Sequence, residues 1–179
     1  MNKRNALINT ALSAMFLAVA FVLPFVTGQI PQIGAVLCPM HIPVMLCGFV
    51  CGAPWGLLVG FIAPLLRSVI FGVPVLLPMA VSMAFELAVY GAVCGLLYRI
   101  FPAKKGYIFC TLFIAMVAGR LMLGLVQFAQ LGFDPAQFGF SAFWAGAVVN
   151  ALPGIALQII IIPAAVMLME KAGVIKKNI

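Results

Sequence analysis

Six polar or ionisable side chains that could bind a ligand lie in or beside long apolar stretches of the sequence: His41, Arg67, Glu86, Arg120, Gln127 and Asn150. A charged residue inside a membrane-spanning helix costs about 2.5–3.5 kcal/mol on insertion scales, so such residues are expected to face a bundle interior or a pathway. A buried guanidinium without a partner is unfavourable, whereas one that receives an anionic ligand gains charge-assisted hydrogen bonds. An intramembrane arginine that no carboxylate matches would therefore favour a small anionic ligand.

Residues suited to catalysis or metal binding are scarce. The chain has three carboxylates and one imidazole: Glu86, Asp134, Glu170 and His41. No His/Asp/Glu metal cluster can be assembled with redundancy from so few groups. An enzyme would have to use His41 and Glu86 with a cysteine nucleophile, and no second base stands in a plausible motif. We therefore expect no enzyme activity, no metal site and no cofactor.

The composition indicates which elements must position these side chains. Of 179 residues, 66% are hydrophobic and 7% are charged, against about 25% charged residues in soluble domains. The chain is therefore expected to be an all-α integral membrane protein that forms a single domain over residues 1–179. The five cysteines lie in or beside apolar stretches without paired zinc-like spacing, so they are expected to pack as small apolar residues.

Apolar runs broken by glycine, proline and charge predict six membrane-spanning helices. The second and third share the tight turn Cys51–Gly56, so they are expected to form a helical hairpin with Pro54 at the start of the later helix. The apolar run after Lys3 and Arg4 continues through Val26, which indicates a retained first helix rather than a cleaved signal peptide. The predicted spans cover about 6–26, 39–52, 54–71, 78–99, 107–131 and 141–169.

Basic residues predict the orientation, because lysine and arginine that flank spans stay in the cytoplasm. Eight of the ten basic residues form three clusters that an even number of spans puts on one side, so both termini are expected to be cytoplasmic. The opposite side carries one charge, Asp134. The net charge of +7 is explained by this topology without nucleic acid. The clusters are Lys3 and Arg4; Arg99, Lys104 and Lys105; and Lys171, Lys176 and Lys177.

The candidate ligand-binding residues are expected at or outside the membrane midplane. A helix rises about 1.5 Å per residue, which puts Arg67 and Arg120 each about 20 Å from the cytoplasmic end of its span. Gln127 shares a helix face with Arg120. A channel or proton relay needs polar groups through the whole thickness, so this asymmetry predicts a pocket that opens outward. A further row at i, i+4 spacing comprises Ser82, Glu86 and Tyr90.

Structural alternatives exist for several of these residues. Arg67 and Glu86 could neutralise each other, which would leave the other intramembrane arginine without a carboxylate. His41 could cap or hydrogen-bond the outer end of the second span instead of contacting a ligand. Asn150 and Gln158 could form interhelical hydrogen bonds or line the pocket.

A stripe of small residues runs along the first predicted helix, where Ala11, Ala14 and Ala18 follow one another at i, i+3 and i+7. Small side chains let another helix approach closely. Two interpretations are open: the stripe packs inside the bundle, or it forms a docking face for a partner protein.

Several stretches carry a resemblance to a known family: Pro39–Val44 (Pro-Met-His-Ile-Pro-Val), Cys47–Phe49, Leu57–Arg67 and Ala84–Leu87. With the predicted topology, they make the chain similar to the substrate-binding S component of energy-coupling factor (ECF) vitamin transporters. The resemblance covers essentially the whole chain. The family's Ala-x-x-x-Ala motif in the first helix matches Ala14 to Ala18.

The resemblance implies that the chain binds a vitamin on the outer side, docks through its first helix on a transmembrane coupling subunit and topples to release its cargo. Two partner ATPases would supply the energy, in agreement with the lack of a Gly-x-x-x-x-Gly-Lys-Ser/Thr phosphate loop. The His-Ile-Pro-Val type of sequence and the two arginines favour pantothenate. Folate, another anionic vitamin, riboflavin, pyridoxine or a queuosine precursor would fit the same scaffold. The expected location is the bacterial plasma membrane, and a membrane-embedded enzyme or a channel is the alternative class.

Overall fold

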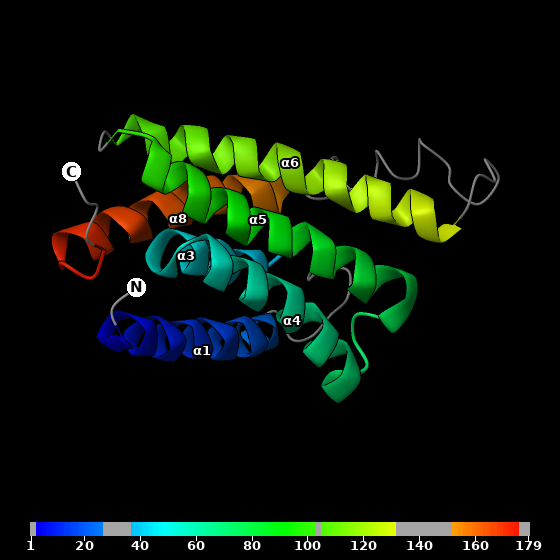
Figure 1. Ribbon diagram of the computed structural model, residues 1–179. Helices are drawn as coiled ribbons and strands as arrows, with labels where there is room; N and C mark the ends of the chain where they lie inside the picture. The colour runs from blue at the N-terminus through cyan, green and yellow to red at the C-terminus, as the bar shows by residue number, and fades with distance from the viewer. Residues whose placement is uncertain (1–2, 27–36, 103–104, 132–151, 176–179) are drawn as a thin grey trace.

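The computed structural model describes residues 3–26, 37–102, 105–131 and 152–175 of the chain. Every regular element in these ranges is helical (Figure 1). The element η1 is a single wide turn with π-type hydrogen bonding that leads into the next helix. The elements are α1 (Lys3–Val26), α3 (His41–Cys51), α4 (Ala53–Phe71), η1 (Leu76–Ala80), α5 (Val81–Ile100), α6 (Gly106–Leu131) and α8 (Leu152–Lys171).

Five of the described helical segments are long and apolar enough to cross a membrane. The helix α3 has 11 residues and is therefore about 17 Å long, whereas a bilayer core is about 30 Å thick. The all-helical membrane fold is thus confirmed, and a complete set of six spans remains a prediction. Residues 141–151 of the predicted sixth span lie outside the described residues. The five segments are Ala6–Phe25, Ala53–Phe71, Leu76–Ile100, Gly106–Gln130 and Leu152–Lys171.

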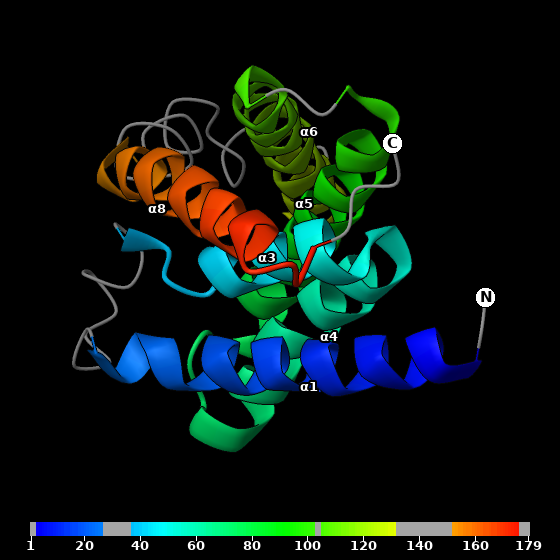
Figure 2. The same ribbon diagram turned by 90° about the vertical axis from the view of Figure 1, so that its left-hand side faces the viewer.

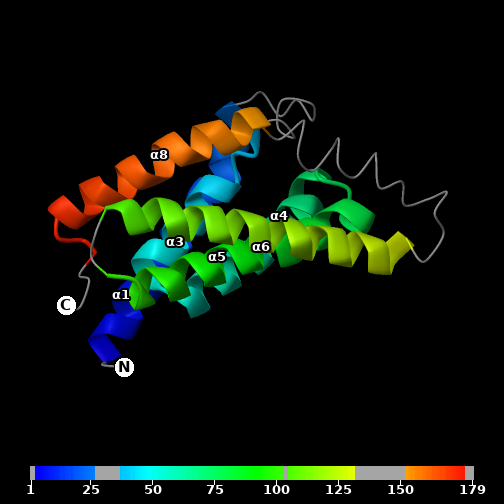
Figure 3. The ribbon, with the colours of Figure 1, turned by 90° about the horizontal axis from the view of Figure 1, so that it is seen from above.

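The short helix α3 forms the centre of the fold. Its residues from His41 to Phe49 are all buried, and Cys51 is buried as well. Figures 2 and 3 show α3 surrounded by longer helices, and it packs against α1, α4, α5 and α8. A helix that is apolar on all sides is expected in a core, so α3 positions its residues deep inside the bundle.

Glycines let α3 and α4 pack closely on α5. The two helices form the predicted hairpin, with Gly52 between them at φ +96° and Pro54 in the first turn of α4. A left-handed φ of this kind is accessible to glycine without steric cost. A Cβ atom on Gly48 or Gly56 would overlap the backbone of Gly91. These contacts fix the height at which α5 presents its polar side chains to α3.

The described basic residues that flank helices gather at one end of the bundle. Figure 1 shows the start of α1, the end of α5, the start of α6 and the end of α8 at the same side of the molecule. We call this the basic end, and the opposite side the far end. Lys104, Lys176, Lys177 and Asp134, on which the predicted orientation also rests, lie outside the described residues. The residues that define the basic end are Arg4, Arg99, Lys105 and Lys171.

Candidate functional site

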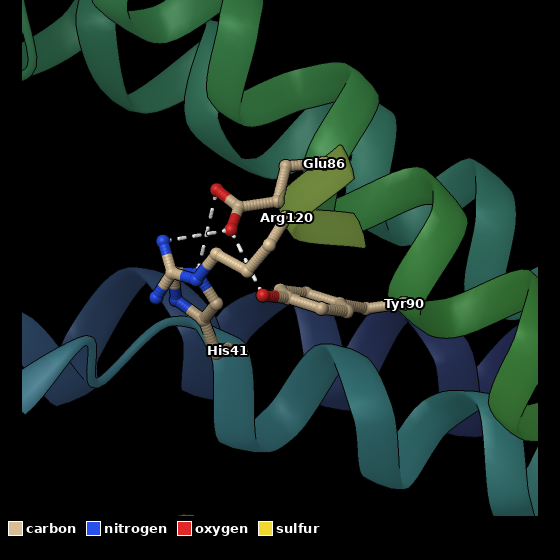
Figure 4. Close-up of polar contacts among 4 residues, drawn as sticks. All are labelled: His41, Glu86, Tyr90 and Arg120. Carbon is tan, nitrogen blue, oxygen red and sulfur yellow. Dashed lines mark hydrogen bonds and ion pairs between the residues drawn. The ribbon is translucent and has the colours of Figure 1, made fainter. Parts of the chain in front are cut away.

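Four polar side chains from α3, α5 and α6 meet inside the bundle (Figure 4). The Arg120 Nη1 atom lies 3.0 Å from Glu86 Oε1, and the Tyr90 hydroxyl donates a hydrogen bond to the same oxygen at 2.9 Å. The His41 Nε2 atom lies 3.8 Å from Glu86 Oε2. We call His41, Glu86, Tyr90 and Arg120 the Glu86 cluster. It unites three of the six residues that the sequence predicted for the site.

Helix geometry explains why these residues meet. Glu86 precedes the end of α5 at Ile100 by fourteen residues, and Arg120 follows the start of α6 at Gly106 by fourteen residues. At about 1.5 Å per residue, both lie about 21 Å from the basic end. Because α5 and α6 pack against each other, the two charges face each other at one level. The cluster therefore lies beyond the middle of the bundle, toward the far end.

Tyr90 belongs to the site although it was not among the predicted site residues. It follows Glu86 by one helical turn, and the predicted i, i+4 row is confirmed for this pair. Its ring fits against α6 because residue 119 is glycine, where a Cβ atom would overlap the Tyr90 ring. The ring also lies beside the His41 imidazole, with 5.4 Å between the centroids. The i, i+4 spacing of Glu86 and Tyr90 was the feature of the sequence that could have placed Tyr90 in the site.

The cluster has more hydrogen-bonding groups than its own contacts use. His41 is 2% exposed and Glu86 is 1% exposed. Within the described part of the chain, neither ring nitrogen of His41 has a hydrogen-bond partner, nor does Arg120 Nε. A buried polar group without a partner costs about 1–3 kcal/mol. The unused groups are therefore a candidate contact for a ligand that supplies acceptor atoms.

Cys38 lies next to the cluster, just before α3. Burial raises the pKa of the Cys38 thiol above its ordinary value, Glu86 raises it as well, and the Arg120 guanidinium lowers it. The thiol is therefore a neutral neighbour of the cluster. The sequence predicted only that Cys38 packs as a small apolar residue. Nothing in the spacing of the cysteines indicated that it lies beside the Glu86 cluster.

Arg67 lies in a different place, between α1 and α4. Its Nη1 atom donates a hydrogen bond to the Phe21 carbonyl at 3.2 Å. Its guanidinium carbon lies 5.7 Å from the Phe25 ring centroid and 5.4 Å from the Phe71 ring centroid. Pro24 is in the same turn of α1 and lacks the N–H that would bond the Ala20 carbonyl, so one helical hydrogen bond is missing beside Phe21. Arg67 therefore stabilises the contact between the two helices.

The expected alternative in which Arg67 and Glu86 neutralise each other is wrong. Glu86 is paired with Arg120, and Arg67 is directed at α1. The same ion pair corrects the expectation that Arg120 would lack an intramembrane carboxylate. The physical reason is that α5 presents Glu86 to α6 and α3, which sequence spacing within single helices does not specify.

The remaining predicted residues are not part of the cluster. Gln127 is half-buried on α6, and Asn150 lies outside the described residues. Gln158 on α8 is 2% exposed, and its Nε2 atom has no hydrogen-bond partner among the residues described. Toward the far end, Ser82 donates to Gln130 Oε1 at 3.3 Å. Gln130 was not predicted, although it lies one turn beyond Gln127 on the same helix.

The alanine stripe is on the outer surface of α1. Ala11, Ala14 and Ala18 are all exposed, whereas Phe16 and Ala20 are buried. The interpretation in which the stripe packs inside the bundle is therefore wrong. Whether a partner covers the stripe remains a prediction.

Other polar groups and cavities offer less to a ligand. Tyr98 donates a hydrogen bond to the Glu170 carboxylate, which joins α5 to α8 near the basic end. A small apolar pocket is lined by Phe109, Leu112 and Phe113 of α6 and Ile159 of α8, and it has no polar group to orient a molecule. In the described ranges, no group of three His, Cys, Asp or Glu side chains could hold a metal ion.

Apolar helices around one buried charged cluster define a multi-pass membrane protein with a candidate binding site. The family model described as "ECF transporter, substrate-specific component" matches residues 9–166. The chain belongs to this family, which is a family of transporters and not of enzymes. The comparison with curated proteins found no match, and neither did the comparison with solved structures. The resemblance in the sequence is thus confirmed for the family and not for the pantothenate-like group.

Proposed function

We propose that the protein binds a small anionic vitamin or related micronutrient on the extracellular side and delivers it inward with an ATP-driven ECF module. The observation that carries the proposal is the Glu86 cluster, which contains buried donor groups that no described residue partners. Membership of the substrate-specific component family supports the same assignment. His41 and Arg120 are the proposed substrate contacts, and Glu86 orients Arg120. Gln127 and Asn150 are also proposed substrate-binding residues.

The proposed topology is one six-span domain over residues 1–179 with both termini in the cytoplasm of a bacterium. The common position of the described basic residues supports it, because cytoplasmic flanks are rich in lysine and arginine. The far end would then be extracellular, and the Glu86 cluster would lie in the outer half of the membrane. A single cysteine at position 134 should be labelled by an impermeant reagent in intact cells. Labelling only after permeabilisation would contradict this topology.

Pantothenate is the favoured substrate. Its single carboxylate can accept charge-assisted hydrogen bonds from the Arg120 guanidinium, which Glu86 holds in place. Because Arg67 is engaged between α1 and α4, the described arginines offer the substrate one guanidinium rather than two. This reduces the support for folate, which carries two carboxylates. Riboflavin, pyridoxine and a queuosine precursor remain alternatives that fit the same family.

The proposed partners are a transmembrane coupling subunit and two ATPases. Exposed Ala11, Ala14 and Ala18 support docking through α1, since small side chains permit close helix contact. The lipid bilayer would surround the other apolar helix faces. Docking at the stripe and binding at the Glu86 cluster would then be separate functions of the chain.

The test compares binding with transport. Purified protein should bind a vitamin from a panel but should move none into liposomes until the partner subunits are added. Replacing Ala14 and Ala18 by Trp should abolish uptake and leave binding intact. The matched control replaces exposed Val69 and Ile70 of α4 by Trp, which should preserve both. Failure to bind any panel vitamin, or transport without partners, would contradict the proposal.

A further inference from the structure

The ion pair between Glu86 and Arg120 carries no net charge. Glu86 contributes one negative charge, and Arg120, which stays protonated in proteins, contributes one positive charge 3.0 Å away. An anionic ligand would therefore add an uncompensated negative charge while His41 is neutral. Glu86 and His41 are at most 2% exposed, and an unpaired charge in such an environment is strongly unfavourable. Binding of an anion needs one more positive charge in the cluster.

Hydrogen-bonding capacity identifies where that charge can arise. The Glu86 oxygens already face Arg120, Tyr90 and His41. Both His41 ring nitrogens lack a hydrogen-bond partner among the described residues. A neutral imidazole has one donor and one acceptor, whereas the protonated ring has two donors. Protonated His41 could therefore donate toward Glu86 with one nitrogen and toward a ligand carboxylate, which only accepts, with the other.

Among the described residues, no titratable group near His41 adds a positive charge beyond that of Arg120, which Glu86 already balances. Besides Glu86, the groups that face it are the Tyr90 hydroxyl on α5, Arg120 on α6 and the Cys38 thiol before α3. The helix α4 also packs against α3, but its Arg67 donates to the Phe21 carbonyl of α1 and does not face His41. The Glu170 carboxylate of α8 accepts a hydrogen bond from Tyr98 near the basic end.

We propose that His41 takes up one proton from solvent when the substrate binds, so that the site selects a monoanion and binds it more tightly as the pH falls. Histidine is the side chain whose charge normally changes between pH 5 and 8. The inference rests on the proposed function, because it assumes that the Glu86 cluster contacts the substrate. It deepens that function by naming a single carboxylate as the recognised group and His41 as the proton acceptor.

Calorimetry on the wild-type protein tests the proposal directly. Pantothenate is titrated at pH 7.5 in phosphate and in Tris, whose ionisation enthalpies differ, and the difference in observed heat gives the number of protons taken up. We expect uptake approaching one proton. Over pH 6.5–8.5 the Kd should rise with pH by up to about tenfold per unit, which is the limit for one linked proton. Panthenol, the neutral alcohol analogue, should bind much more weakly and without proton uptake.

Variants assign the proton to a residue. His41→Gln should abolish both the uptake and the pH dependence of the Kd, whereas Tyr98→Phe, near the basic end, should retain both. In Glu86→Gln the Arg120 charge is no longer cancelled and can balance a bound monoanion by itself, so proton uptake should fall well below one although His41 is still present. The wild-type measurement stands if a variant fails to fold, because thermal melting identifies such a variant.

The outcomes separate this inference from the proposed function. If pantothenate does not bind, the same paired measurement uses biotin and biotinamide, then nicotinate and nicotinamide. Binding without proton uptake, uptake that survives His41→Gln, or equal affinity for an acid and its neutral analogue would each overturn the inference and leave the transport function standing. Tight binding of an uncharged vitamin such as riboflavin would do the same. If no vitamin of any charge binds, the proposed function fails, and this inference fails with it.

Discussion

The two intramembrane arginines of this chain lie at about the same distance from the basic end but in opposite chemical settings. Arg67 is 3% exposed, donates to a backbone carbonyl and lies over two aromatic rings. Arg120 faces the Glu86 carboxylate, and its Nε atom has no partner among the described residues. The first arginine joins two helices, and the second retains unused binding capacity.

This difference teaches that burial of a charge does not by itself identify a functional residue. Aromatic faces and a carbonyl stabilise Arg67 without a ligand. In the Glu86 cluster, donor groups of Arg120 and His41 have no hydrogen-bond partner in the described ranges, and a substrate can supply the missing acceptors. Substitutions at the two positions should therefore affect different measured quantities.

The largest expected effect is on stability and comes from Glu86→Leu. The substitution leaves the Arg120 guanidinium in the bundle without its carboxylate, and breaking a buried ion pair costs about 3–5 kcal/mol. Thermal unfolding in detergent measures the loss. The double variant Glu86→Leu with Arg120→Leu should recover most of the stability, because no lone charge remains. A single variant as stable as wild type would show that the ion pair is weak.

Arg67→Met should destabilise the protein without changing substrate affinity. The substitution removes a hydrogen bond from a charged donor to the Phe21 carbonyl, which is worth about 1.5–3 kcal/mol. Melting and ligand titration on the same preparation separate the two quantities. A weakened affinity with unchanged melting would move Arg67 into the binding site and remove the distinction between the arginines.

Arg120→Lys should affect binding more than stability. Lysine keeps a positive charge near Glu86 but lacks the planar guanidinium and its Nε donor. We expect the Kd to rise about 10- to 100-fold, equivalent to about 1.4–2.7 kcal/mol, with a small change in melting temperature. The matched control Arg67→Lys should leave the Kd unchanged. Equal losses of affinity in both variants would contradict the comparison.

The smallest expected effect belongs to Tyr90→Phe. Glu86 loses the tyrosine hydrogen bond but keeps Arg120, so stability should fall by about 1 kcal/mol. The ring still fits against Gly119, so the packing of α5 on α6 is preserved. Double-variant analysis with Glu86→Gln measures how much of the effect depends on the carboxylate charge. A loss of stability larger than that of Glu86→Leu would mean that the Tyr90 hydroxyl stabilises the fold through more than its hydrogen bond to Glu86.

Patterns within one helix were well predicted from the sequence. The apolar runs predicted the helices, and the turn at Gly52 predicted the α3–α4 hairpin. The i, i+4 spacing of Glu86 and Tyr90 predicted a shared face, because helical periodicity depends on local spacing alone. The distance of Arg120 along its helix followed from the rise of about 1.5 Å per residue. The family model matches residues 9–166, which confirms the family that these local features indicated.

The sequence by itself determined that the chain is an apolar helical membrane protein and which few charged side chains its helices contain. Only the tertiary structure decided that Glu86 pairs with Arg120 rather than Arg67, and that the α1 alanines face outward. The physical reason is that the partner of a side chain depends on helix packing and rotation. In this fold, glycine contacts such as Gly48 and Gly56 against α5 set that packing between segments distant in the chain.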